Sequence, residues 1–218
     1  MFDRTFPCGA CGKALPADRP EELILGRNAG VICDACRPAR TEEFRLGLLR
    51  KAGVPEQMLS RAGEMRRLPY PTVAPWVLIQ GTVGTGKTWL AVELLLAVKD
   101  PREVRFVDWP CFMADRQASI GHDDREDPMA SLRSFRGLVV LDDLGRERPG
   151  DWATETVNLI LCQRYNDAAK TVITTNLSLP AISELYGDRV ASRINGSISG
   201  VWQPRWKKDR RKRIEAAA

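Results

Sequence analysis

The chain has 218 residues, of which 44% are hydrophobic and 28% charged, a composition typical of a globular protein. No apolar run approaches the roughly 18 to 20 residues that a membrane-spanning helix needs, and the N-terminus lacks the apolar stretch of a signal peptide. These features argue against a membrane protein, and we expect a cytoplasmic one. The net charge of +5 is a mild basic excess.

Residues 1–40 are expected to form a small zinc-binding module. They contain two C-x-x-C pairs separated by 21 residues: Cys8, Cys11, Cys33 and Cys36. This spacing predicts a tetrahedral zinc site with four cysteine ligands, and a segment this small needs such a metal to fold. Four protein ligands leave no open position on the zinc, so its role would be structural. Four unrelated thiols or an iron–sulfur centre are the alternatives.

Residues 41–68 are expected to form a helical linker with a break at Gly53–Pro55. From residue 69 to residue 203, apolar runs alternate with segments of helical periodicity. Strands are expected at Trp76–Gln80, Val104–Asp108, Leu138–Leu141, Thr171–Thr175 and Ile198–Trp202. Helices are expected at Lys87–Val98, in one or two segments of 110–136, at Trp152–Ala168 and at Pro180–Ile194. This alternation predicts an α/β fold with a parallel sheet.

Residues 204–218 form a basic C-terminal tail, with six Lys and Arg side chains between Lys207 and Arg213. Such a run can bind phosphates electrostatically. A solvated tail without a ligand is the alternative reading of so short a segment.

Residues 81–88 match the phosphate-loop pattern G-x-x-x-x-G-K-[ST] in full, between an expected strand and an expected helix. Glycines let the backbone turn tightly around an anion, and the helix N-terminus adds positive dipole. Lys87 is expected to reach the β- and γ-phosphates of ATP, and Thr88 to bind Mg²⁺. The nucleotide-binding candidates are Gly81, Val83, Gly84, Thr85, Gly86, Lys87, Thr88 and Trp89, the last an unusual residue type at that position.

Asp142 and Asp143 directly follow the apolar run Leu138–Leu141. Asp142 is placed to hold Mg²⁺, and Asp143 to orient or deprotonate the attacking water. Asn176, at the end of the expected strand Thr171–Thr175, is a candidate sensor of the γ-phosphate. The alternatives are solvated acids at a strand end and an Asn that serves the turn.

These motifs occur in the order found in DnaC-type helicase loaders, a group that also includes DnaI- and IstB-like proteins, and the sequence resembles them over residues 45–203. The matching segments are Gly81–Thr88, Leu141–Gly145, Arg164–Tyr165, Thr174–Leu177 and Gly187–Ile194. The resemblance implies an AAA+ P-loop ATPase core with a five-stranded sheet, ATP and Mg²⁺ as ligands, and a replicative helicase and single-stranded DNA as partners. Because only 25 residues follow Arg193, the C-terminal lid of many AAA+ proteins is expected to be missing.

The resemblance also implies a role for Arg193. In AAA+ proteins the matching arginine reaches into the ATP site of the neighbouring subunit, where it stabilises the transferring phosphoryl group. The chain is therefore expected to self-assemble through Arg193 in trans. Arg189, one helical turn earlier, would lie on the same side. A surface salt bridge is the alternative.

Three functions are consistent with these features. The first is an ATP-dependent helicase loader that binds the helicase through its N-terminal module and single-stranded DNA through its core, with DNA contacts from Arg133, Arg136 and the tail. The second is an IstB-like transposition ATPase that acts on duplex DNA, although such proteins usually lack a four-cysteine zinc module and carry Glu where Asp143 stands. The third is a zinc-bearing adaptor that binds nucleotide without hydrolysing it, which the shorter Asp143 keeps open.

Overall fold

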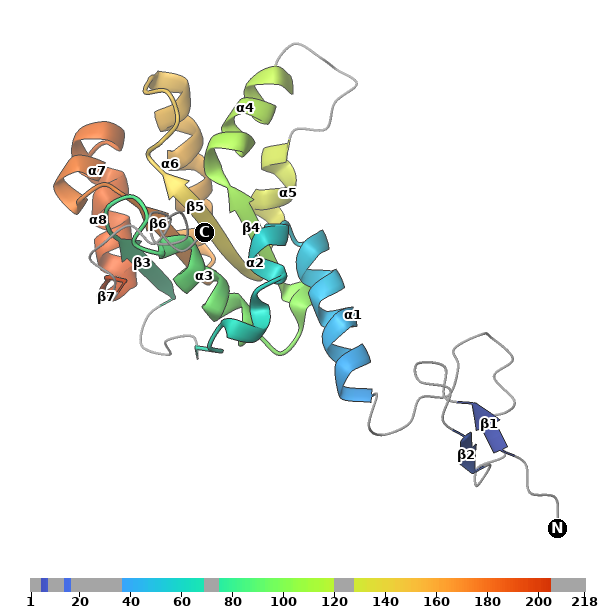
Figure 1. The fold of residues 1–218 in the computed structure, drawn as a ribbon. Helices are drawn as coiled ribbons and strands as arrows, with labels where there is room; N and C mark the ends of the chain where they lie inside the picture. Colours follow the sequence, from blue (N-terminus) through green and yellow to red (C-terminus); the bar gives the residue numbers. More distant parts are fainter. Residues whose placement is uncertain (1–4, 8–13, 17–36, 69–74, 120–127, 205–218) are drawn as a thin grey trace. The chain divides into compact units, whose positions relative to one another are not determined.

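The computed structural model describes residues 5–7, 14–16, 37–68, 75–119 and 128–204 (Figure 1). The chain divides into two compact units, Met1–Leu48 and Leu49–Ala218. No helix within the described ranges is both long and apolar enough to cross a bilayer.

In the smaller unit, strands β1 (Thr5–Pro7) and β2 (Ala14–Pro16) pair as an antiparallel hairpin, with Phe6 opposite Leu15. The residues between them include Cys8 and Cys11. These two cysteines lie outside the described residues, as do Cys33 and Cys36, so the zinc site stays a prediction.

The predicted linker is helical, and it consists of one longer helix followed by two short helical turns. Helix α1 (Arg37–Lys51) starts before the expected residue 41 and is followed by α2 (Glu56–Leu59) and the 3-10 turn η2 (Ala62–Glu64). The break at Gly53–Pro55 is confirmed. Gly53 has a φ of 95°, and a Cβ atom there would lie 2.4 Å from the carbonyl oxygen of Phe106, so the close approach requires glycine.

The larger unit contains a five-stranded sheet in which every neighbouring pair of strands is parallel, as predicted. In spatial order its strands are β4 (Val104–Asp108), β5 (Leu138–Leu144), β6 (Thr171–Thr175), β3 (Trp76–Gln80) and β7 (Ile198–Trp202). Four strands have the predicted bounds. Strand β5 is longer than predicted because Asp142 still pairs with Asp108 of β4, and pairing with β6 resumes at Leu144, opposite Thr175, after a register shift between Leu141 and Leu144.

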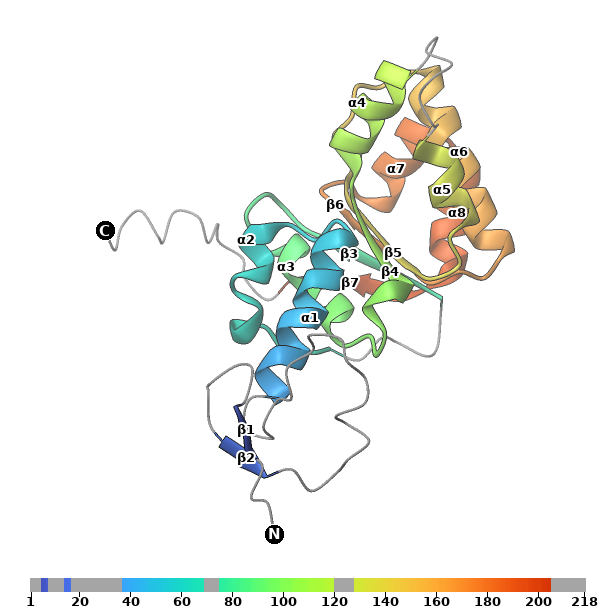
Figure 2. The same ribbon diagram turned by 90° about the vertical axis from the view of Figure 1, so that its right-hand side faces the viewer.

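Helices cover both faces of this sheet (Figure 2). One face packs on α3 (Lys87–Leu96), and the other on α4 (Trp109–Ser119), α5 (Pro128–Ser134), α6 (Asp151–Asn166), α7 (Leu179–Tyr186) and α8 (Asp188–Ser197). Alternate side chains of each strand point to opposite faces, so Trp76 and Leu78 of β3 join the core under α4 to α8. The predicted helix Pro180–Ile194 is divided at Gly187, which has a φ of 87°.

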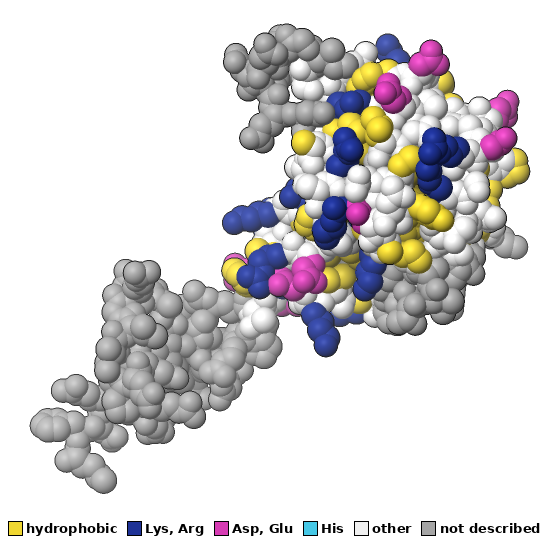
Figure 3. All heavy atoms as spheres, turned by 180° about the vertical axis from the view of Figure 1, so that it is seen from behind, with side chains coloured by type: hydrophobic (Ala, Val, Ile, Leu, Met, Phe, Trp, Pro, Cys, Tyr) yellow, Lys and Arg dark blue, Asp and Glu magenta, His cyan; other side chains and the backbone are white. Residues whose placement is uncertain are grey.

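Lys and Arg side chains are spread across the face of the larger unit that Figure 3 shows. One arginine is instead fully buried. Arg164 of α6 is 1% exposed and donates hydrogen bonds to the carbonyl oxygens of Phe135, Gly137 and Lys170, and to the Thr171 hydroxyl at 2.8 Å. A single guanidinium therefore satisfies the backbone groups at the amino ends of β5 and β6.

We predict that Arg164→Ala strongly destabilises the fold, because it removes the donor to the Phe135 and Gly137 carbonyl oxygens and the buried bond to the Thr171 hydroxyl. Urea unfolding should show a loss of about 3 kcal/mol in the free energy of unfolding, the cost of more than one unsatisfied buried group. Arg50→Ala is the matched control, since Arg50 forms an ion pair with Glu56 at the surface. A similar, small effect of both substitutions would contradict the structural role of Arg164.

Candidate active site

The predicted phosphate loop connects β3 to α3 and has the backbone geometry that its glycines allow. Gly84 and Gly86 have φ values of 77° and 88°, and α3 begins directly after Gly86. Gly81 lies so close to Thr85 that a Cβ atom would be 2.9 Å from the threonine hydroxyl oxygen. Val83 is 60% exposed, so its side chain is not packed in the core, and Val83 contributes to the loop through its backbone.

Lys87 and Asn176 were both predicted for this site, and the structure brings them together. The Lys87 side chain is buried, and its Nζ donates to the Asn176 Oδ1 at 2.6 Å and to the Thr82 carbonyl oxygen at 3.1 Å. The Gly81 N–H donates to the Thr175 carbonyl oxygen at 3.2 Å, which ties the loop to the end of β6. The ammonium group of Lys87 thus lies at the phosphate loop, bonded to two neutral oxygens. The phosphate oxygens of ATP would be charged acceptors in the same place.

Thr88 and Asp142, the predicted magnesium ligands, are also in contact. The Thr88 hydroxyl donates to Asp142 Oδ2 at 3.0 Å, and the Asp142 side chain is buried. Burial raises the pKa of Asp142 to about 6, the nearby charges of Asp143 and Asp108 add to this, and the hydrogen bonds from Thr174 and Thr88 oppose it. A hydroxyl and a carboxylate are oxygen ligands of the kind Mg²⁺ prefers, and its charge would offset the cost of burying the acid. The residues present therefore fit magnesium.

Thr174 has a part that the sequence did not reveal. Its hydroxyl donates to Asp142 Oδ1 at 2.6 Å and accepts from the Asp143 N–H at 2.8 Å, so it holds the Asp142 carboxylate and the backbone of Asp143. The next hydroxyl, of Thr175, donates to the Leu144 carbonyl oxygen at 2.7 Å. Two consecutive threonines at the buried end of a strand were the available signal, because each buried hydroxyl needs a partner.

Asp143 is the residue before the last one of β5, and it has a positive φ of 61°. Its carboxylate oxygen Oδ2 accepts a hydrogen bond from Arg146 Nη1 at 2.8 Å. The side chain of Asp143 is 25% exposed, so water reaches it, unlike the buried Asp142. The structure thus separates the two acids by environment, and the ion pair with Arg146 was not anticipated.

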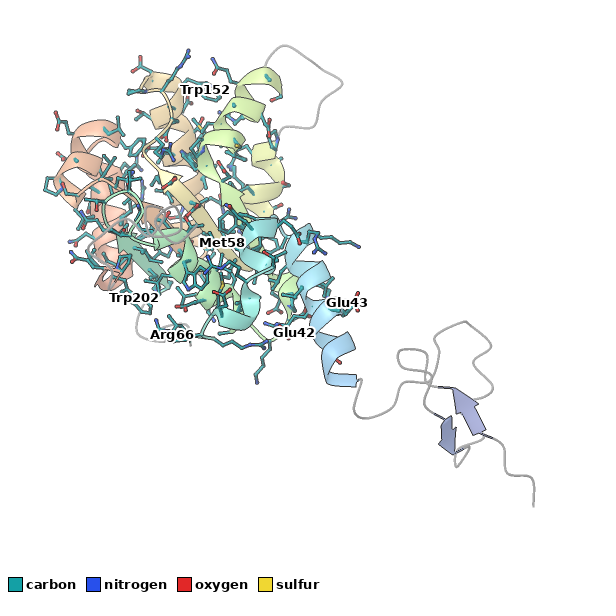
Figure 4. The ribbon with its side chains drawn as sticks, viewed as in Figure 1. Glu42, Glu43, Met58, Arg66, Trp152 and Trp202 are labelled. Carbon is teal, nitrogen blue, oxygen red and sulfur yellow. The ribbon has the colours of Figure 1, made fainter. Side chains whose placement is uncertain are left out.

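Trp89 packs against the linker. Its indole N–H donates to Glu93 Oε1 at 3.1 Å, one turn later on α3, and the Arg61 guanidinium lies 4.7 Å from the centre of its ring. Glu93 also accepts from the Arg66 backbone N–H at 3.0 Å, which holds the segment after η2 against α3 (Figure 4). This packing accounts for a tryptophan at this position, and its assignment to nucleotide binding stays a prediction.

Arg193 lies on α8, and its guanidinium is 5.9 Å from the centre of the Tyr165 ring. Its Nη1 atom is buried and makes no hydrogen bond to any described residue. Arg189, one turn earlier on α8, is exposed. Within the described part of the chain Arg193 has no hydrogen bond to the phosphate loop or to the two aspartates, and its role in trans stays a prediction.

Comparison with known proteins places the chain in a family. A model of the IstB-like ATP binding proteins matches residues 52–194, more than half of the chain and all of the site described above. The chain belongs to this family. No curated protein matches it.

Solved structures similar to the chain include proteins of DNA replication. A crystal structure of the DnaC helicase loader has a TM-score of 0.52 and 27% identity, and covers 62% of this chain and 82% of its own. The DnaI structure has a TM-score of 0.48 at 18% identity, with 70% and 80% covered. AMPPCP-bound DnaA from Aquifex aeolicus has a TM-score of 0.48 at 20% identity, with 74% and 48% covered. The fold is that of an AAA+ P-loop NTPase, as expected.

The raised pKa of Asp142 predicts how stability depends on pH without Mg²⁺. Between the ordinary value of 3.8 and about 6, the folded state holds a proton that the unfolded state has lost. The free energy of unfolding should therefore fall with rising pH in this window, by about 2 to 3 kcal/mol relative to Asp142→Asn, and the difference should stay constant above it. Urea unfolding of both proteins in EDTA measures this, and a difference that does not change with pH would contradict it.

Proposed function

We propose that this protein is an ATPase that loads a replicative helicase onto single-stranded DNA. The observation that carries the proposal is the joining of Lys87 to Asn176 and of Thr88 to Asp142 at one edge of the sheet. Family membership supports ATP as the ligand. The similarity to the DnaC helicase loader, at 27% identity, supports loading as the task.

In this mechanism each residue of the site acts on ATP in a distinct way. Lys87 exchanges its neutral partners for the β- and γ-phosphates. Thr88 and Asp142 would hold Mg²⁺, whose charge would offset that of the phosphates. Asp143 orients the attacking water, and Asn176, released by Lys87, is able to donate to the γ-phosphate. A shorter acid than Glu in this position favours slow, regulatory hydrolysis.

The N-terminal module is the proposed docking element for the helicase. Its described part includes the hairpin in which Pro7 pairs with Ala14, and Cys8 and Cys11 are proposed to supply two of the zinc ligands. Cys33 and Cys36 would complete the zinc site. Arg133 and Arg136, both exposed near the C-terminal end of α5, are proposed to contact DNA phosphates.

The family match gives one specific reason to keep a second candidate, a transposition ATPase that assembles on duplex DNA, because the matched model is named for IstB-like proteins. The two candidates differ in the partner protein and in the form of DNA. A nucleotide-binding adaptor without hydrolysis is the third possibility.

We predict that the full-length protein co-purifies with the replicative helicase of its host in the presence of Mg-ATP, and that deletion of residues 1–40 abolishes this. ATP turnover should rise more with single-stranded than with duplex DNA. Capture of no helicase together with stronger stimulation by duplex DNA would favour the transposition ATPase. Mg-ATP binding without turnover under any condition would favour the adaptor.

Arg193→Ala should affect hydrolysis only when subunits are assembled, because the arginine would act on the neighbour's ATP. At protein concentrations that give assembly on DNA, turnover should fall at least about tenfold, and basal turnover of the dilute protein should not change. Arg189→Ala is the comparison variant, because Arg189 lies one helical turn before Arg193 on α8. An equal loss in dilute and assembled protein would show that Arg193 acts within its own subunit or supports the fold.

A further inference from the structure

The turn that follows β5 has a backbone held in place from several sides. Gly145 has a φ of 94°, and a Cβ atom there would lie 2.4 Å from Leu177 Cδ1, so it packs against the segment after β6. The Gly145 N–H donates to Glu147 Oε2 at 3.0 Å, and the other Glu147 oxygen accepts from the Tyr186 hydroxyl of α7. The turn therefore has little freedom to move as a whole.

Arg146 is the exposed and movable part of this turn. Its side chain is 60% exposed, yet its Nη1 lies 2.8 Å from Oδ2 of Asp143. The hydrogen bond and charge of Asp143, with smaller contributions from Asp108 and Asp142, raise the pKa of the Arg146 guanidinium. The guanidinium thus lies over the acidic edge of the sheet where the attacking water would be oriented.

This ion pair affects the proposed reaction directly. The guanidinium occupies one acceptor position on Oδ2 of Asp143, and its charge offsets the negative charge that would draw the water's proton. An exposed ion pair adds little to stability, so a competing anion is able to separate it. Hydrolysis would then depend on an event that moves Arg146.

Arg148 suggests what that anion is. It is exposed, two residues further along the same turn, and makes no hydrogen bond or ion pair within the described residues. Two guanidinium groups on one exposed turn suit successive phosphates of a nucleic-acid strand better than a single small anion. An open, flexible single strand is able to reach a turn beside the active site, as the proposed loading function requires.

We propose that Arg146 restrains Asp143 in the free protein, and that the phosphates of single-stranded DNA, bound by Arg146 and Arg148, release it. This inference rests on the proposed function, since it assigns to the same site a control by its DNA ligand. Binding of DNA would thereby be coupled to hydrolysis within one subunit, without movement of the turn's backbone.

The test is steady-state ATP turnover of the full-length protein with and without oligo-dT. Arg146→Ala should raise kcat without DNA several-fold, leave the KM for Mg-ATP unchanged, and reduce the further stimulation by oligo-dT. Arg148→Ala should weaken the response to oligo-dT. Arg102→Ala is the matched control, because Arg102 is an exposed arginine paired with the nearby Asp100, away from the site.

A double substitution makes the result specific to Asp143. In an Asp143→Asn background, Arg146→Ala should give no increase in kcat, because the group that it restrains is gone. An Arg146→Ala kcat equal to or below that of the wild type, with Mg-ATP still bound, would overturn the restraint alone. Equal stimulation by thymidine monophosphate at the same phosphate concentration would contradict a nucleic-acid ligand. Failure of every variant and the wild type to bind Mg-ATP would overturn the proposed function as well.

Discussion

The buried carboxylate of Asp142 is the interaction on which the active site depends. It accepts hydrogen bonds from Thr88 at the start of α3 and from Thr174 near the end of β6, and thereby joins three elements distant in sequence. Burial makes its charge unfavourable without a cation, which the raised pKa expresses. The residues present fit Mg²⁺, which we propose completes the site, and hydrogen bonds to α3 and β6 already hold the Asp142 carboxylate in place.

Much of the core was predictable because buried parallel strands have continuous apolar sequences between turns. The bounds of Trp76–Gln80 and Thr171–Thr175 follow from that pattern alone. The end of β5 was not predicted, because Asp142 continues the strand by pairing with Asp108 of β4, and this pairing is not visible in the apolar pattern. The helix break at Gly187 was also missed, because apolar periodicity continues on both sides of it while the backbone needs a positive φ.

The site was predictable where a local motif carries the chemistry, as in Gly81–Thr88, and where parallel strands end at a common edge. Side-chain contacts between residues distant in sequence were not predictable. The sequence does not reveal that Arg146 pairs with Asp143, or that Trp89 and Glu93 hold the linker. The first contact lies at the acidic end of β5, and the second lies on the helix that follows the phosphate loop.

We propose that the folded chain has one preformed site for Mg-ATP. Isothermal titration calorimetry of the full-length protein tests it most directly, with Lys87→Ala and the exposed Lys99→Ala as a matched pair. We expect saturable, Mg²⁺-dependent binding at one site per chain, which is lost in Lys87→Ala and retained in Lys99→Ala. Absence of any binding heat from wild-type protein that unfolds cooperatively, or equal binding by Lys87→Ala, would contradict it.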